Sequence, residues 1–220
     1  MPLQNRVTPF GDIVAVAARG TLTGNRGIIH DPATKTLLTR RWSSYTWITC
    51  TCEFRGRRRK VMATRSWTEL FFLDEASAFA AGHRPCFYCR GADALAFRAA
   101  WARGNGCAEP RAPQMDRILH RERLDERHRK RLHPLPAPLA DLPDGAMVAA
   151  DGESFLLLSG KPLMWAMDGY RMAAAQPTSF ELLTPPSTLR AFAAGYRPAL
   201  HPSATAVTSG GMQPPHSPKV

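Results

Sequence analysis

Several common features are missing from this chain of 220 residues. No window approaches 18 consecutive apolar residues, so the sequence predicts no membrane-spanning helix. The first residues lack the basic and then apolar pattern of a secretory signal, and we therefore expect a cytoplasmic protein. Cysteine is scarce, with five residues. In the cytoplasm, cysteines that occur in pairs are metal ligands more often than disulfides.

The sequence patterns of several enzyme classes are missing as well. The glycine-rich segment 19–30 lacks the Lys-Ser/Thr ending of a phosphate-binding P-loop. No H-E-x-x-H, paired-carboxylate or H-N-H pattern supports a nuclease that would use a divalent ion. His30-Asp31 fits a catalytic pair, but we expect a turn-capping aspartate beside a solvated histidine. Three histidines in a basic segment lack a cysteine partner, so no second metal site is predicted: His120, His128 and His133.

Acidic residues are few, with 18 Asp and Glu against 29 Lys and Arg, and the imbalance is confined to one part of the chain. Residues 1–133 carry 24 basic and 12 acidic residues, a balance of +12, whereas residues 134–220 carry 5 and 6, a balance of −1. Arginine dominates, and its planar guanidinium group binds phosphate through two hydrogen bonds. The charge therefore predicts nucleic acid as a partner, with a coding bias toward arginine as the alternative explanation.

Four of the five cysteines form two pairs. Cys50 and Cys52 stand in a C-x-C motif, and Cys86 and Cys89 in a C-x-x-C motif. This spacing is typical of a zinc ion bound by four thiolates. Residues 42–54 are rich in aromatic and β-branched side chains, which predicts a strand. Side chains two positions apart share one face of a strand, so both thiols of the C-x-C motif can reach one ion.

A cluster of cations follows the first cysteine pair. Arg55-Gly56 predicts a turn, and the chain then returns in a predicted strand over residues 61–64. Cations at the tip of such a hairpin either lie along a phosphate backbone or protect an exposed strand from aggregation. The residues predicted to contact nucleic acid are Arg55, Arg57, Arg58, Arg59, Lys60, Arg65, Arg84 and Arg90.

Helix signals surround the second pair. Asp74 is a good N-cap for a helix over residues 75–81, and Gly82 fits the position just after its end. A second helix is predicted over residues 94–102, with Asp93 as its cap.

The run from Phe72 to Arg90 contains Phe-Leu-Asp-Glu-Ala, then Ala-Ala-Gly-His-Arg-Pro and the C-x-x-C motif. It resembles the metal-binding domain of Ada-type DNA repair proteins, in which E-A…A-G-aromatic-R-P-C-x-x-C follows a strand. The resemblance covers residues 42–103 and maps the first cysteine pair of the family, C-x-x-x-C there, to Cys50 and Cys52. It implies a small sheet with helices around one four-thiolate zinc ion, DNA rather than RNA as partner, and a cysteine of the first pair that accepts a methyl group from a methylated DNA phosphate.

The rest of the chain gives weaker signals. Residues 114–132 predict a charged helix with a narrow apolar stripe, which is either solvated or lies along phosphates. Turns at Asp151-Gly152 and at residues 159–161 predict hairpins of a small antiparallel sheet. The string A-F-A-A-G-[H/Y]-R-P occurs at 78–85 and again at 191–198, which indicates a degenerate repeat or a recurrent way to end a helix.

We therefore predict an α+β fold: a small antiparallel sheet with short helices around a four-Cys zinc site, followed by a small β-rich region. The expected divisions are a basic zinc-binding domain over 1–133, a β-rich region with a terminal helix over 134–200, and a disordered tail over 201–220. The leading functional prediction is a zinc-stabilised nucleic-acid-binding protein linked to DNA repair. The alternatives are a single-turnover alkyl acceptor and an accessory protein whose zinc is only structural.

Overall fold

The computed structural model describes residues 1–56, 60–173 and 177–208, and it is a mixed α/β fold with several sheets and short helices. Among these residues no helix is long and apolar enough to span a bilayer. The strands are β1 Gln4–Val7, β2 Ile13–Ala15, β3 Leu22–Asn25, β4 His30–Asp31, β5 Thr36–Leu37, β6 Ile48–Thr51, β7 Leu70–Phe72, β8 Arg84–Pro85, β9 Met147–Ala150, β10 Glu153–Leu158, β11 Lys161–Ala166, β12 Gly169–Met172 and β13 Glu181–Leu182. The helices are α1 Glu75–Ala80, α2 Gly91–Gly104, α3 Ala112–Arg123, α4 Pro186–Ala193 and α5 Pro202–Thr208, with a 3-10 turn at Leu139–Asp141.

A six-stranded sheet in the order β2-β1-β7-β3-β6-β8 forms the N-terminal half. The sheet was predicted to be antiparallel, but it is mixed, because β1 pairs with β7 and β6 with β8 in parallel. Strands β4 and β5 form a separate hairpin. The C-terminal sheet, β12-β11-β10-β9-β13, is wholly antiparallel, as predicted.

The two hairpin turns of the C-terminal sheet fall where the sequence predicts them. Asp151 and Gly152 form a two-residue loop between β9 and β10, and Ser159 and Gly160 form one between β10 and β11. All four residues have φ between 52° and 81°. That geometry matches the right-handed twist of the flanking strands, and a short polar residue followed by glycine adopts it at low cost.

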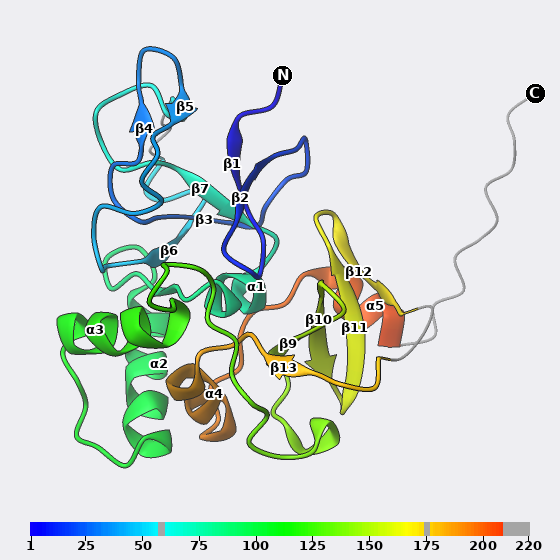
Figure 1. Cartoon of the computed structure of the whole chain (residues 1–220). Helices are drawn as coiled ribbons and strands as arrows, with labels where there is room; N and C mark the ends of the chain where they lie inside the picture. The colour runs from blue at the N-terminus through cyan, green and yellow to red at the C-terminus, as the bar shows by residue number, and fades with distance from the viewer. Residues whose placement is uncertain (57–59, 174–176, 209–220) are drawn as a thin grey trace, which may run out of the picture.

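Helix α1 lies at the centre of the molecule, between the two sheets (Figure 1). Its N-cap is Asp74, as predicted, and the cap forms a reciprocal pair of hydrogen bonds with Ser77. One hydrophobic cluster joins Leu73 and Ala76 to the C-terminal sheet, and a second joins Phe79 to α2, α3 and α4. Both clusters therefore include residues from each side of position 134.

Carboxylates at the start of α1 accept hydrogen bonds from the C-terminal part of the chain. Asp74 Oδ2 accepts one from the Tyr170 hydroxyl at 2.9 Å, and Glu75 Oε1 accepts one from the Tyr196 hydroxyl at 2.8 Å. Backbone N–H groups of residues 199 and 201 complete the set. These buried carboxylates, which we call the α1 acceptor pair, bind the last described segment to the first half of the molecule.

The repeated string ends two helices in the same way. In α1 the backbone N–H of Gly82 bonds to Phe79 O, and in α4 that of Gly195 bonds to Phe192 O. Both glycines have positive φ, 87° and 103°, and the following residue in each case donates to the carbonyl five residues before it. The two helices also pack together, with 5.2 Å between the ring centroids of Phe79 and Phe192.

Two predicted elements are shorter than the sequence suggested, and a third is absent from the described residues. The strand predicted over 42–54 is confined to Ile48–Thr51. Before it, the side chains of Ser43 and Ser44 accept hydrogen bonds from backbone N–H groups, and these bonds take the place of a strand ladder. The return strand over 61–64 is absent from the described residues, where the chain makes turns. The helix over 114–132 ends at Arg123, since Asp125 Oδ1 accepts two backbone N–H groups and stabilises a turn.

The predicted disorder from residue 201 onward is wrong for its first part. Residues 202–208 form α5, which packs on β12, and Ser203 Oγ accepts a hydrogen bond from the Tyr170 N–H. Ala204 is fully buried in the central cluster. Residues 209–220 lie outside the described part of the chain.

Candidate metal centre

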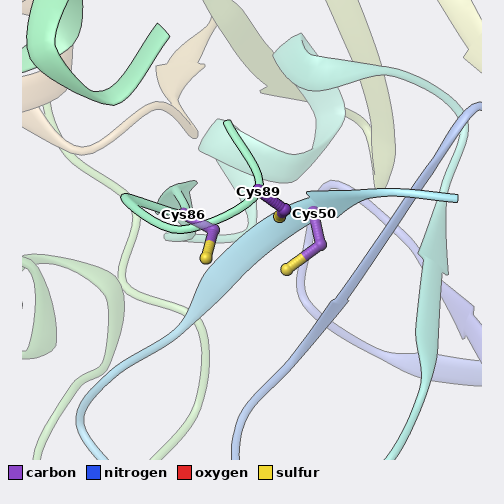
Figure 2. A group of neighbouring side chains, drawn as sticks. All are labelled: Cys50, Cys86 and Cys89. Atoms are coloured by element: carbon purple, nitrogen blue, oxygen red, sulfur yellow. The ribbon is translucent and has the colours of Figure 1, made fainter. Parts of the chain in front are cut away.

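Cys50, Cys86 and Cys89 meet at one end of the N-terminal sheet (Figure 2). Cys50 belongs to β6, while the C-x-x-C pair lies in the turn between β8 and α2. The parallel pairing of β6 and β8 brings them together, because the Cys86 N–H donates to Thr49 O at 2.9 Å. The turn is closed by Arg90 N–H, which donates to Cys86 O at 2.9 Å.

The three sulfur atoms lie within 4.8 Å of one another, and none of the three cysteines forms a disulfide. Zinc–sulfur bonds of about 2.3 Å in a tetrahedron place thiolates roughly 3.8 Å apart, so a small contraction of this cluster would accommodate the ion. Cysteine sulfur is also the ligand that soft and borderline metals prefer. The residues present thus fit a metal ion with three protein ligands.

The environment separates the acidities of these thiols. A hydrogen bond from Cys50 is the main cause that lowers the pKa of Cys86, to about 5. The same interaction, together with burial, raises the pKa of Cys50. Tyr88 N–H also points to Cys86 Sγ, at 3.4 Å. The cluster therefore holds one thiolate readily, and a cation would be needed to stabilise two or three.

Cys52, the fourth predicted ligand, does not join this group. It is exposed, and its Sγ lies 3.5 Å from Thr21 O. The prediction assumed that the strand continues through Cys52, but β6 ends at Thr51, and the alternation of side chains ends with it. Cys52 nevertheless lines the same cavity as the other three. The described residues therefore show three close cysteines, and a four-thiolate site is not shown. Cys107 is exposed and lies apart from the three-cysteine cluster.

Arg84 and Arg90 hold in place the turn that carries Cys86 and Cys89, which we call the metal loop. Both arginines were predicted to contact nucleic acid instead. Arg84 forms two hydrogen bonds to Asp116, at 2.7 and 2.8 Å, and both side chains are only 4% exposed. Arg90 is buried too and pairs with Glu75 at 2.7 Å. An arginine that already binds a buried carboxylate has no free face for phosphate.

A cavity of about 870 Å³ lies over the three cysteines. Four aromatic side chains line it, Phe54, Phe71, Trp67 and Tyr88. Trp67 is 42% exposed and Tyr88 is 62% exposed, although large aromatic side chains are usually covered. Sequence reasoning missed Trp67, which stands in no motif, and it treated Tyr88 only as a spacer between two ligands. We call this cavity the metal cleft.

One cation, Arg55, lies beside the metal cleft, whose own charged lining residues are Glu53 and Glu69. The guanidinium carbon of Arg55 lies 5.2 Å from the Phe54 ring centroid and 5.8 Å from that of Tyr88. Lys60 and Arg65 are exposed nearby in the chain. The remaining predicted contacts lie outside the described residues: Arg57, Arg58 and Arg59.

The dipeptide His30-Asp31 has a structural role. Asp31 Oδ1 accepts a hydrogen bond from Ala33 N–H, as a turn-capping residue does. His30 was expected to be solvated, but it is buried, and its Nδ1 lies 2.7 Å from the Thr68 hydroxyl oxygen.

Comparison with known protein families, with curated proteins and with solved structures finds no match to this chain. The resemblance to the Ada metal-binding domain therefore stays a prediction, and the function has to be argued from the three-cysteine cluster and the cleft above it.

Proposed function

We propose that this chain is a zinc protein that binds nucleic acid, DNA in the first place, at the metal cleft. The observation that carries the proposal is the exposed Tyr88 ring, with Arg55 against it, beside the three-cysteine cluster. Bases stack on exposed aromatic side chains whatever their sequence, while cations attract the backbone.

The dimensions of the metal cleft suit an unpaired base. Small-molecule pockets measure about 300–1,000 Å³, and the 870 Å³ of this cleft falls in that range. Tyr88 offers a ring for stacking, and Arg55 lies over the Tyr88 ring, where it can also reach a phosphate. We therefore expect a preference for single strands, ends or extruded bases over intact duplex.

Zinc would have two roles in this proposal. It would join β6 to the turn before α2, and it would set the position of Tyr88 between two ligands. Three protein ligands leave one position of a tetrahedral ion for Cys52, for water or for an atom of the bound molecule.

The test is a binding titration of the zinc-loaded protein against labelled single-stranded and duplex oligonucleotides, DNA and RNA, over a series of salt concentrations. Affinity should fall steeply as salt rises, because counterions are released from the phosphates. Tyr88→Ala should weaken binding by about 1–3 kcal/mol, which is roughly five- to 150-fold. Tyr45→Ala is the matched control, since Tyr45 is also exposed but lines no part of the metal cleft.

Absence of binding at low salt would refute the proposal. Equal affinities of the Tyr88→Ala and Tyr45→Ala proteins would refute the metal cleft as the binding site, even if the chain binds nucleic acid elsewhere.

A second candidate, the alkyl acceptor, is favoured by the position of the thiols at the floor of an open cavity. In such a reaction a thiolate attacks the methyl carbon of a phosphotriester, a sulfur–carbon bond forms, the carbon–oxygen bond breaks, and the phosphodiester leaves as an anion. Peptide mass mapping after incubation with methylated-phosphate DNA tests it. One added methyl group on Cys50 or Cys52, the predicted acceptors, or on Cys86 or Cys89 would support the candidate, and four unmodified cysteines would eliminate it.

A further inference from the structure

A second cavity, of about 770 Å³, lies apart from the metal cleft and shares no lining residue with it. It is bounded by the loop that follows β1, by Arg26 just after β3, by Trp42 and Trp47, and by residues 123–130 after α3. The segments around it adjoin the N-terminal sheet and α3 (Figure 1), with Ala81 after α1 and Gly152 between β9 and β10 completing the lining. We call it the cationic cavity.

Two buried arginines share one tryptophan in this cavity. Arg26 is 2% exposed and Arg123 is 1% exposed. Their guanidinium carbons lie 4.0 and 3.8 Å from the centre of the Trp47 ring. An indole ring is the best aromatic partner for a cation, but it carries no negative charge and leaves both arginines uncompensated.

Neither arginine forms an ion pair within the described residues. Arg26 donates to the Gly11 carbonyl and to His83, and Arg123 donates to the Gly82 and Tyr45 carbonyls and lies 2.9 Å from His120 Nδ1, all of them without negative charge. Arg26 Nη2 and Arg123 Nε are buried and have no hydrogen-bond partner among the described atoms. Buried charged groups are normally paired, because desolvation without a partner costs several kcal/mol per ion.

Lys130 adds a third cation. Its ammonium group donates to Ala80 O and to Leu183 O, both neutral acceptors. Burial, with repulsion from Arg123 and Arg26, lowers its pKa to about 7. The carboxylates lining the cavity are Asp12 and Asp125, and Asp125 is already bound to Arg129 at 3.1 Å. The lining cations, Arg26, Arg41, Arg123, Arg129 and Lys130, therefore exceed the lining carboxylates by 5 − 2 = 3.

We propose that the cationic cavity binds a small organic phosphate, with the phosphate group against Arg26, Arg123 and Lys130. A carboxylate supplies one negative charge and two acceptor oxygens, whereas a phosphate monoester supplies up to two charges and three oxygens. The phosphate chemistry thus matches three cations better. Inorganic phosphate would leave most of the 770 Å³ unfilled, and Phe10 and Trp42 offer apolar surface for an organic part.

The site is independent of the proposed nucleic-acid cleft. A terminal phosphate of an oligonucleotide has the same chemistry as a mononucleotide, so the experiment has to separate the two sources. The probes are inorganic phosphate, a nucleoside 5′-monophosphate, and a short oligonucleotide with and without a 5′-phosphate. Acetate at matched ionic strength is the control anion.

The experiment is isothermal titration of the zinc-loaded full chain, with thermal unfolding as a second measurement. We expect saturable binding of the nucleoside monophosphate at one site and a rise in unfolding temperature that acetate does not produce. Lys130→Gln should weaken this binding at least about tenfold, which is the value of one charge-assisted hydrogen bond. Lys161→Gln, which removes an exposed lysine outside the cavity, should bind as the wild type does.

Tyr88→Ala should also leave phosphate binding unchanged, because Tyr88 lines only the metal cleft. Binding confined to the 5′-phosphorylated oligonucleotide would assign the phosphate to a nucleic-acid end. Failure of the wild type to bind any phosphorylated probe would overturn the proposal whatever the variants do. Equal affinities of the Lys130→Gln and Lys161→Gln proteins would do the same.

Discussion

Replacement of Asp116 by alanine tests what holds the metal loop in place. Asp116 lies on α3, and Arg84 lies on β8, the short strand that immediately precedes Cys86. Two hydrogen bonds of 2.7 and 2.8 Å join their side chains, and the Thr46 hydroxyl donates to Asp116 Oδ2 at 3.0 Å. After Asp116→Ala the guanidinium group of Arg84 stays buried without a counter-charge.

The loss follows from the burial. Removal of one partner from a buried ion pair costs about 3–5 kcal/mol in the free energy of unfolding. A domain has about 5–15 kcal/mol in total, so the variant should be severely destabilised. The matched control is Asp168→Ala, which breaks an Arg–Asp pair of similar length, 2.8 Å, whose side chains are well exposed. That pair should contribute less than about 1 kcal/mol.

Urea unfolding of the zinc-loaded proteins at pH 7 measures both values. If Asp116→Ala costs no more than Asp168→Ala, then the Arg84–Asp116 pair does not support the loop, and our reasoning is wrong. The variant also tests the earlier prediction for Arg84. If Arg84 contacts nucleic acid, the folded molecules of Asp116→Ala, in which Arg84 has lost its partner, should bind nucleic acid more tightly than the wild type does. We expect no such tightening.

Three further predictions follow from the geometry. Since burial lowers the pKa of Lys130 to about 7, the unfolded chain binds more protons than the folded one between pH 7 and its ordinary 10.5. The free energy of unfolding should therefore rise with pH, by about 1 kcal/mol between pH 7 and 8. Denaturant titration of Lys130→Met should show that this contribution is lost. An equal pH dependence of the unfolding free energy in the wild type and in Lys130→Met would contradict the prediction. Elemental analysis should find about one zinc ion per chain in Cys52→Ser and a loss of zinc in Cys89→Ser, and the reverse result would make Cys52 the essential ligand. Gly82→Ala should destabilise the protein by more than Gly195→Ala, for which about 1 kcal/mol of backbone strain is expected. A Cβ at Gly82 would lie 2.6 Å from the Arg123 side chain, while one at Gly195 meets nothing within 4 Å. Equal unfolding temperatures of the two variants would contradict the packing argument.

Some local signals in the sequence were read correctly, although the cap predicted at Asp93 is wrong, since α2 begins at Gly91 with Arg90 at the N-cap. The cap at Asp74, the glycine after α1, and the two hairpin turns of the C-terminal sheet each depend on a few neighbouring residues, and the structure confirms them. The C-x-x-C turn also lies beside Cys50, as the spacing predicted.

Features that depend on distant residues were missed. The parallel pairing of β6 with β8 joins residues 36 positions apart in the sequence, such as Ile48 and Arg84, and no local pattern predicts it. The end of β6 at Thr51 decides that Cys52 lies outside the cluster. Arg84, in turn, was counted as a surface cation because a sequence shows charge without showing burial, and its buried partner, Asp116, lies on α3, far along the chain.

The α1 acceptor pair has a consequence for how the molecule responds to heat. Glu75 binds Arg90 at the end of the C-x-x-C turn and also the Tyr196 hydroxyl after α4, so one carboxylate connects the metal turn with the C-terminal segment. If either the metal turn or the C-terminal segment unfolded alone, the buried carboxylate of Glu75 would lose its partner in that part. Calorimetry should therefore record one cooperative transition instead of two, and it should move as a whole when the metal is removed.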